Sequence, residues 1–172
     1  MRFPVVALLL ASHAVSAQTP WWQRVVVLPV EPGRPIAVQE GIDYLGRPEA
    51  QVHMDVYRPK GERAPLAAVL LVHGGPITSA IPVEARRLGQ YLSLGSLIAS
   101  RGLVAVTFSH RLTGANAIDT AAADVRSAFA YIVAHASELR IDASRLCVWA
   151  ISGGGILSVA LPTHPTARNH AY

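Results

Sequence analysis

The stretch from Arg145 to Gly155, RLCVWAISGGG, decides the fold class of this chain. Its apolar run is typical of a strand that is covered on both faces, and the glycines follow it without a linker. A strand that ends in small-x-Ser-x-Gly and turns at once into a helix holds its serine in a tight bend, beside the free N–H groups of the helix N-terminus. The segment AISGG, Ala150 to Gly154, fits this pattern. Ser152 is therefore a candidate nucleophile, although a structural glycine-rich turn would use the same residues.

Strand and helix patterns alternate before this turn. Apolar runs predict strands at Val52 to Tyr57, Ala67 to Val72 and Leu103 to Phe108, and the first two are expected to be neighbours in one sheet. One more candidate strand lies around Arg24 to Leu28. The stretch from Pro29 to Pro48 is too rich in Pro and Gly for long regular structure.

Two segments between and after these strands predict helices. Apolar residues recur at helical spacing between Glu84 and Ser100, with Gly102 as the predicted stop. Further along, Asp119 occupies a predicted N-cap. A helical stripe follows it at Val125, Ala128, Phe129, Ile132, Val133 and Ala136. This alternation predicts an α/β domain with a mostly parallel sheet and helices on both faces.

A second motif, His73-Gly74-Gly75, ends the apolar strand at 67–72. In folds with a serine elbow, a backbone N–H from this loop pairs with the N–H after the nucleophile to form an oxyanion hole. The candidate donors are Gly153 and either Gly74 or Gly75, because glycine lets the backbone approach a bound group closely. A plain tight turn is the alternative interpretation.

Composition excludes several classes of protein. The 172 residues suffice for one domain, and a content of 51% hydrophobic and 15% charged residues argues against disorder and coiled coil. The net charge is +4, but the basic residues are scattered, so no nucleic-acid partner is expected. Cys147 is the single cysteine, which excludes an intrachain disulfide. Its place in an apolar strand predicts an inert buried thiol.

The sequence does not carry the common cofactor or metal motifs. The third glycine of a dinucleotide-binding fingerprint would fall on Ser158, and there is no Walker lysine. His53, His73, His110 and His135 lack the spacing of metal ligands. We therefore expect no metal and no cofactor. We also expect no membrane span, because no apolar stretch is long enough.

The N-terminal residues 1–17 have the features of a secretory signal peptide. Arg2 is followed by the apolar run Val5 to Ala11 and by the small residues Val15-Ser16-Ala17. A buried N-terminal helix fits less well, because Pro4 would interrupt it. The predicted domain is therefore 18–172, and the protein is expected to be secreted or periplasmic.

Five segments, in order, resemble the amino-terminal half of an α/β-hydrolase. They are DVYRP at 55–59, LLVHGGP at 70–76, FSHRL at 108–112, DVRSAFAYI at 124–132 and RIDASRLCVWAISGGG at 140–155. The strongest resemblance is to HGG-type carboxylesterases and lipases, including acetyl-esterase-like and dienelactone-hydrolase-like members.

This resemblance implies hydrolysis of a small-molecule ester through an acyl-serine intermediate, without a cofactor. Ser152 would be the nucleophile, and the N–H groups of Gly153 and of Gly74 or Gly75 would hold the oxyanion. Asp124 and Arg111 match family positions that orient the chain around the elbow. Prolyl-oligopeptidase-like enzymes share these segments, so a peptidase stays open.

The chain departs from the family pattern in two ways. Ala150 stands where glycine is commoner. The family places an Asp or Glu and then a His after the serine, yet the residues after Ser152 include no Asp or Glu and only His164 and His170. We therefore expect a truncated α/β-hydrolase domain that lacks the C-terminal strands. The strand at 145–151 would be an exposed edge that favours self-association.

Three functional hypotheses follow. The first is a serine esterase that is inactive or impaired in this chain. The second is a non-catalytic remnant that binds a ligand or partner. In the third, His164 or His170 acts as the base without a catalytic acid, with a second chain completing the site. The sequence does not identify the acyl and alcohol groups of a substrate.

Overall fold

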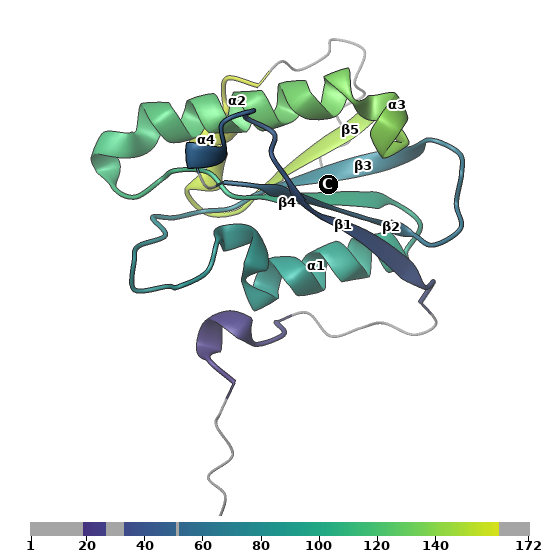
Figure 1. Ribbon diagram of the computed structural model, residues 1–172, viewed down its shortest axis with the longest axis horizontal. Helices are drawn as coiled ribbons and strands as arrows, with labels where there is room; N and C mark the ends of the chain where they lie inside the picture. Colours follow the sequence, from purple (N-terminus) through teal and green to yellow (C-terminus); the bar gives the residue numbers. More distant parts are fainter. Residues whose placement is uncertain (1–18, 27–32, 51, 162–172) are drawn as a thin grey trace, which may run out of the picture.

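Figure 1 shows the computed structural model of the chain, which describes residues 19–26, 33–50 and 52–161. Its centre is a five-stranded sheet with the order β1-β2-β4-β3-β5. The strands are β1 (Ile36–Ile42), β2 (Met54–Pro59), β3 (Leu66–Val72), β4 (Val104–Phe108) and β5 (Ile141–Ala150). β1 and β2 pair antiparallel, as do β2 and β4, whereas β3 lies parallel to both β4 and β5. The sheet is therefore mixed.

Helices cover both faces of the sheet. α1 (Gly89–Ser100) lies on one face and contacts β2 and β4. α2 (Ile118–Ala134) and the short α3 (Ala136–Leu139) lie on the other face (Figure 1). The short α4 (Gly154–Ser158) follows β5 and contacts α2. Short 3-10 turns lie at Trp21–Gln23, Pro48–Ala50, Ala85–Arg87 and Ala115–Ala117. The predicted α/β architecture, with helices on both faces, is confirmed.

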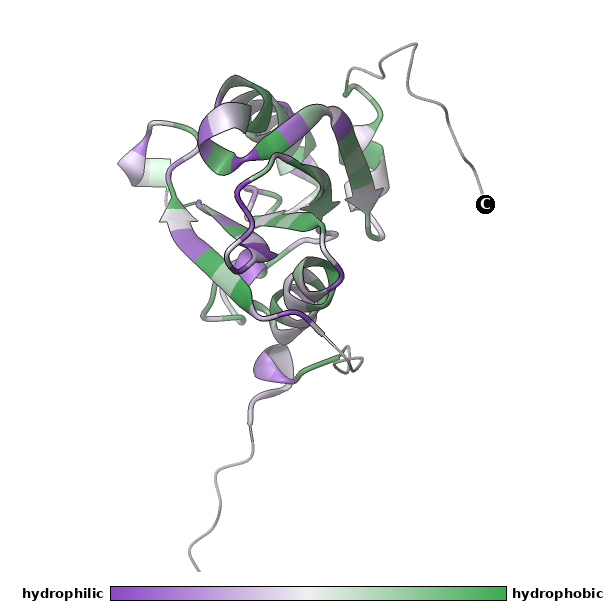
Figure 2. Ribbon diagram, turned by 90° about the vertical axis from the view of Figure 1, so that its right-hand side faces the viewer, coloured by the Kyte–Doolittle hydropathy of each residue, from purple (hydrophilic) through white to green (hydrophobic). Residues whose placement is uncertain are grey.

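The alternation of side chains along the central strands builds two apolar clusters, one on each face of the sheet. Val106 of β4 packs in the same cluster as Val125 and Ile132 of α2. The next residue towards the start of β4, Ala105, belongs to the opposite cluster, with Tyr91 of α1. Figure 2 shows hydrophobic (green) strand segments between the two helical layers. Burial on both faces explains the continuous apolar runs of β3 and β4.

The four principal predicted strands are confirmed as β2, β3, β4 and β5, with bounds shifted by a few residues. The expected pairing of the first two was wrong, because β4 lies between β2 and β3. The expectation that 29–48 lacks long regular structure was also wrong. Its prolines and most of its glycines lie outside Ile36–Ile42, which is free to pair with β2 as β1.

The prediction of a strand at 24–28 was wrong for the residues that the structure describes. Gln23 ends a 3-10 turn, and residues 24–26 have no regular structure. The rest of that segment lies outside the described residues. The first predicted helix begins at Gly89 rather than near Glu84, because a 3-10 turn at Ala85–Arg87 precedes it.

The second predicted helix is confirmed as α2, with two corrections. Its N-cap is Ala117, and Asp119 lies in the first turn instead, where a carboxylate still interacts favourably with the helix dipole. Within the predicted stripe, Ala128 is fully buried, whereas Val133 is 44% exposed on the outer side of the helix.

The prediction that Cys147 is a buried thiol was also wrong. Cys147 lies in the middle of β5 and is exposed. β5 is the last strand of the described sheet. Cys147 points to the face that α1 covers, but α1 lies mainly over β2 and β4. Trp149, on the same face, is 47% exposed. Strand hydrophobicity alone therefore did not predict burial here.

Some predicted features lie outside the described residues. These are the signal peptide at 1–17 and the tail that contains His164 and His170. Across the described ranges, the longest apolar helices are still too short or too polar to cross a lipid bilayer.

Candidate active site

Ser152 lies in a sharp turn between β5 and α4, as the elbow pattern predicts. Its φ is +53°, a left-handed conformation that is strained for a residue with a side chain. The turn is held by hydrogen bonds from Ile151 N–H to the Val72 carbonyl (2.9 Å) and from Gly154 N–H to the Ile151 carbonyl (3.0 Å). Ser152 itself is exposed. The structure thus presents the candidate nucleophile at the surface on a tightly bonded bend.

Gly154 shows why the turn requires small residues. A Cβ on Gly154 would lie 2.5 Å from the Val72 carbonyl oxygen and 2.8 Å from the His73 carbonyl oxygen. The start of α4 therefore packs directly on the backbone at the end of β3. Gly155 has open space at the same position. Only one of the two glycines is thus required by close packing.

The HGG loop lies directly beside the elbow. A Cβ on Gly74 would lie 2.9 Å from the Ser152 Cβ and 3.3 Å from the Gly153 nitrogen. A Cβ on Gly153 would lie 3.8 Å from the Gly75 nitrogen. The structure therefore brings together the four residues that sequence analysis proposed: Ser152, Gly153, Gly74 and Gly75.

The backbone nitrogen of Gly75 faces the elbow. A Cβ on Gly153 would have this nitrogen as its nearest neighbour, at 3.8 Å. We therefore take the Gly75 N–H as the candidate oxyanion donor from this loop. Tyr91 of α1 lies near His73, and burial raises its pKa to about 12.

Two buried histidines lie stacked at the base of the HGG loop, with ring centroids 3.5 Å apart and an interplanar angle of 9°. The His110 N–H donates to His73 Nε2 (3.2 Å), and His110 Nε2 donates to the His73 carbonyl (2.9 Å). His73 Nδ1 contacts the Gly74 carbonyl. Burial lowers the pKa of His73 to about 3, and His110 acts in the same direction. Burial also lowers the pKa of His110.

The segment that carries His110 is anchored to α2. Asp124 accepts hydrogen bonds from the Arg111 backbone N–H (2.9 Å), from Arg111 Nε (2.9 Å) and from its terminal nitrogen (2.7 Å). The Tyr44 hydroxyl donates to the Ser109 carbonyl (2.7 Å). Asp124 and Arg111 therefore anchor the segment that supports the HGG loop, while their predicted role in orienting the chain around the elbow stays a prediction.

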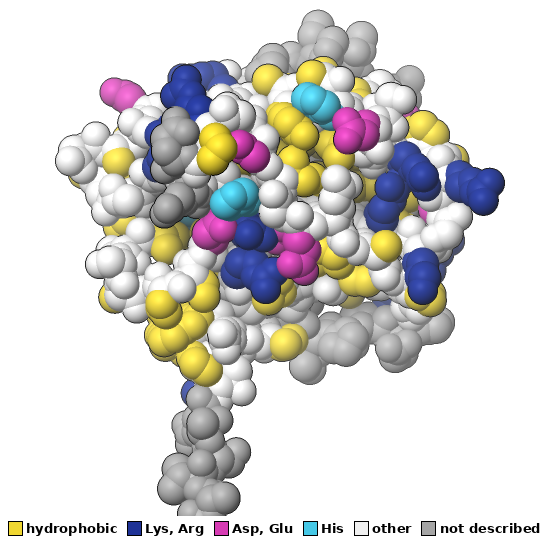
Figure 3. Space-filling model, in the orientation of Figure 1, with side chains coloured by type: hydrophobic (Ala, Val, Ile, Leu, Met, Phe, Trp, Pro, Cys, Tyr) yellow, Lys and Arg dark blue, Asp and Glu magenta, His cyan; other side chains and the backbone are white. Residues whose placement is uncertain are grey.

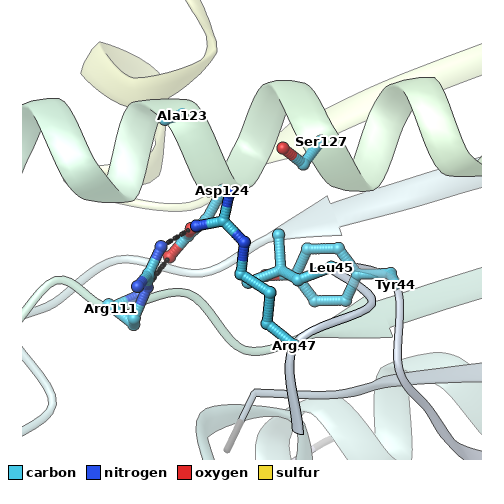
Figure 4. A pocket seen from close by; sticks show the side chains of 7 residues that line it. All are labelled: Tyr44, Leu45, Arg47, Arg111, Ala123, Asp124 and Ser127. Atoms are coloured by element: carbon cyan, nitrogen blue, oxygen red, sulfur yellow. Dashed lines mark hydrogen bonds and ion pairs between the residues drawn. The ribbon is translucent and has the colours of Figure 1, made fainter. Parts of the chain in front are cut away.

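A cavity of about 180 Å³ opens beside this ion pair (Figure 4). It is lined by Tyr44, Leu45, Arg47, Arg111, Ala123, Asp124 and Ser127. Figure 4 shows the Arg111 guanidinium and the Asp124 carboxylate meeting edge to edge below α2. Neither Ser152 nor the HGG glycines line this cavity. It is therefore separate from the elbow.

A second ion cluster supports the turn before α1. Arg86 bonds both Glu84 and the fully buried Asp55, and His53 Nδ1 lies 3.0 Å from Glu84. Burial raises the pKa of Glu84, but hydrogen bonds from Arg86 and His53 outweigh it, and the net pKa is lowered. Figure 3 shows acidic and basic side chains lying next to each other on this face of the molecule. One guanidinium, that of Arg86, thus serves two carboxylates in this cluster, which is remote in sequence from the elbow.

The described residues do not include an evident base for Ser152. In His73, Nδ1 is held by the Gly74 carbonyl and Nε2 accepts from His110. In His110, Nε2 donates to His73, and Nδ1 is buried. Among the described residues, no group of three or more His, Cys, Asp or Glu side chains could hold a metal ion. Sequence reasoning named the candidate nucleophile and the candidate oxyanion loop, but it did not foresee the His73–His110 stack, because stacking depends on how the two loops meet.

The fold, the serine elbow and the adjoining HGG loop define an α/β-hydrolase. Sequence comparison gives the family: the BD-FAE family model matches residues 54–169, so the chain belongs to the BD-FAE family, a family of α/β-hydrolase esterases. No curated protein gives a significant match.

Solved esterases share the fold over part of their length. Esterase Est22 matches with 25% identity over 72% of this chain and 37% of its own, at a TM-score of 0.57. Est2 of the Planctomycetes species Thermogutta terrifontis matches with 25% identity over 76% and 44%, at a TM-score of 0.52. A bacterial brefeldin A esterase matches with 21% identity over 80% and 37%, at a TM-score of 0.60. The chain thus spans less than half the length of these esterases.

Proposed function

We propose that this chain carries the nucleophile and the oxyanion hole of a serine esterase that acts on carboxylic esters. The observation that carries the proposal is the contact between the two predicted motifs: the Gly74 backbone lies against Ser152 and Gly153 in the elbow. Segments far apart in the sequence thus meet where a nucleophile needs its oxyanion donors. The match to the BD-FAE family supports the same reaction class.

In this reaction, Ser152 Oγ attacks the ester carbonyl carbon and loses its proton to a base. The carbonyl oxygen becomes an oxyanion, which the N–H groups of Gly153 and Gly75 stabilise. Collapse of this intermediate breaks the bond to the alcohol, which leaves with a proton, and acyl-Ser152 remains. Water then attacks the acyl-serine, releases the carboxylic acid and restores the hydroxyl. The N-terminus of α4 adds little to the stabilisation of the oxyanion, because that helix is short.

The base and its acid partner are the parts that the described residues do not supply. Each oxyanion donor contributes roughly 3 kcal/mol to transition-state stabilisation, and an oxyanion hole alone retains some rate enhancement over water. We therefore expect slow acylation of Ser152 and strongly impaired turnover in this chain. A non-catalytic remnant that binds a ligand is the competing proposal, favoured by the lack of an evident base for Ser152 among the described residues.

Covalent labelling separates these two proposals. The chain would be incubated with a fluorophosphonate and with p-nitrophenyl acetate, since esterase Est22 has been solved with p-nitrophenol. We expect Ser152 to be labelled, and Ser152→Ala to abolish labelling. Ser158→Ala is the matched control: this half-buried serine of α4 donates to the Gly154 carbonyl, so its loss should leave labelling intact. An unlabelled wild-type chain would favour the binding remnant.

The tail histidines are tested with the same probe. Changing both His164 and His170 to Ala should not change the labelling rate if the oxyanion hole alone activates Ser152. A large loss would favour the third hypothesis, in which a tail histidine is the base.

We also propose that the protein works outside the cytoplasm, from the signal-peptide pattern at 1–17. N-terminal sequencing of the protein from its native source should begin near Gln18. An intact Met1 would contradict the proposal.

A further inference from the structure

We infer that His110 is a positioning residue for the oxyanion hole: it holds His73, and His73 in turn aims the Gly75 N–H at the elbow. This inference rests on the proposed function, because it assigns a role within that site. It concerns a buried histidine that neither the nucleophile nor the oxyanion donors require by themselves.

The hydrogen bonds of the two histidines assign their imidazole protons. A carbonyl oxygen can only accept, so His73 Nδ1 carries the hydrogen that faces the Gly74 carbonyl. His73 Nε2 is then the acceptor for the His110 backbone N–H. By the same logic, His110 Nε2 carries the hydrogen that faces the His73 carbonyl. Both rings are thus neutral, and each has one defined tautomer.

The peptide group between Gly74 and Gly75 couples the position of one carbonyl to the direction of one N–H. The carbonyl of residue 74 and the N–H of residue 75 belong to the same planar peptide group, and they point in opposite directions. When His73 Nδ1 fixes the Gly74 carbonyl, it also fixes the direction of the Gly75 N–H. Gly75 needs such an external constraint, because glycines on both sides of that peptide leave its backbone torsions free.

His110 holds His73 in place through its ring and its backbone. Its ring lies flat on His73, and its Nε2–H and backbone N–H bond the His73 carbonyl and ring nitrogen respectively. These contacts fix the rotamer and the tautomer of His73. The adjacent Arg111 is bonded to Asp124 of α2, and the Leu112 carbonyl accepts from Ile77 N–H (3.1 Å). The HGG loop is therefore bonded to the 109–112 segment at both of its ends.

Charged and titratable neighbours do not disturb this assignment. His73, at the end of β3, faces His110 and Tyr91 of α1. His110 faces Asp124 of α2, which favours its protonation, but burial is the larger effect and lowers its pKa. His110 Nδ1 is buried and has no hydrogen-bond partner among the described residues. A second proton on that nitrogen would therefore have no acceptor.

The test uses one matched set of variants. His110→Phe keeps a flat ring but removes the Nε2 donor, whereas His110→Gln keeps a donor and loses the ring. His135→Phe is the control, because His135 also stacks on an aromatic ring, at 3.9 Å from Tyr131, and also bonds a carbonyl through a ring nitrogen. It lies at the end of α2, outside the elbow and the HGG loop.

The first readout is nitrogen NMR of the wild-type chain near pH 7, which does not depend on activity. We expect His73 as the Nδ1–H tautomer and His110 as the Nε2–H tautomer. The second readout is hydrogen exchange of the Gly75 amide, which should accelerate in His110→Phe and not in His135→Phe. A cationic His110, the opposite tautomer, or unchanged exchange in His110→Phe would overturn the inference.

The third readout is the rate of fluorophosphonate labelling at Ser152. Loss of one oxyanion donor lowers rates by about 100-fold to 1,000-fold, so a misdirected donor should lower labelling by roughly 10-fold or more in His110→Phe. His110→Gln should recover part of that loss. If the wild type is not labelled, the proposed function fails, but the NMR and exchange results still decide the role of His110. If His110→Phe does not fold, the wild-type tautomers and His110→Gln decide it.

Discussion

β4 and β5 have similar apolar sequences but very different surroundings. Every residue of β4 is buried. In β5, only Ile141 is buried, and the residues near its end alternate between half-buried and exposed. β4 pairs with strands on both sides, whereas β5 pairs only with β3 among the described strands. Apolar composition therefore indicates a strand, but the neighbours of that strand determine whether its side chains are buried.

The two regions also differ in their role at the site. The interior strands β3 and β4 end in the HGG loop and the 109–112 segment, which are bonded to each other. β5 pairs with β3 and ends at the elbow, and Gly154, at the start of α4, packs closely on the Val72 carbonyl at the end of β3. The candidate site thus forms where a rigid interior meets an exposed edge.

The largest expected effect comes from breaking this junction with Gly154→Ala. The new methyl group would lie 2.5 Å from the Val72 carbonyl, so α4 or β3 must shift. We expect the free energy of unfolding in urea to fall by about 3 kcal/mol or more. Gly155→Ala is the control, because its methyl group meets open space and alanine favours the helix by up to about 1 kcal/mol. Equal effects of the two changes would show that the junction is not tightly packed.

A second pair of variants compares the interior with the edge directly. Leu70 of β3 is fully buried, whereas Leu146 of β5 is half-buried, and both pack in the cluster under α2. Leu70→Ala should lower the free energy of unfolding by about 3 kcal/mol, in the usual range for a buried leucine. Leu146→Ala should lower it by about 1 kcal/mol, because less apolar surface is lost. Similar values in urea titrations would contradict the contrast between β3 and β5.

The contrast explains what the sequence could and could not predict. The periodic segments gave β2 to β5, α1 and α2, and the two glycine-rich motifs identified Ser152, Gly153, Gly74 and Gly75 as a candidate site. The exposure of Cys147 was missed because burial depends on α1, which covers other strands. β1 was missed because the flanking prolines suggested irregular structure. The His73–His110 stack joins two loops, and no local pattern encodes such a contact.

A lower pH should decrease the free energy of unfolding, because the interior of the fold contains two neutral buried histidines. The pKa of His73 is lowered to about 3 in the folded chain, from an ordinary value near 6.5. Below pH 6.5 the unfolded chain binds a proton that the folded chain does not, so stability falls as the pH falls through this window. His110, whose pKa is also lowered, acts in the same direction.

The slope approaches about 1.4 kcal/mol per pH unit for each histidine. Urea titrations at pH 7.0 and pH 5.0 measure it, above the range where most carboxylates titrate. His110→Gln should reduce the slope. A free energy of unfolding that is constant over this range would show that the two buried histidines are not neutral in the folded chain.

The exposed edge of β5 is the place where we expect the smallest change in stability. The outer backbone groups of β5 have no strand partner among the described residues, and two antiparallel copies of β5 would satisfy each other's groups about a two-fold axis. We therefore propose that a second copy of this chain pairs there. Sedimentation should show concentration-dependent dimers, and mild oxidation should cross-link them through the exposed Cys147.

Trp149→Lys separates this edge pairing from general surface stickiness. Trp149 is 47% exposed on β5, and Val133 is 44% exposed on α2, so Val133→Lys is a control of matched exposure. A lysine on the edge strand opposes pairing, so Trp149→Lys should shift the chain to monomer, with a change in the free energy of unfolding below about 1 kcal/mol. Val133→Lys should leave the dimer intact. If both lysines dissolve the dimer equally, its interface lies on α2 as well as β5, and the edge strand alone does not explain association.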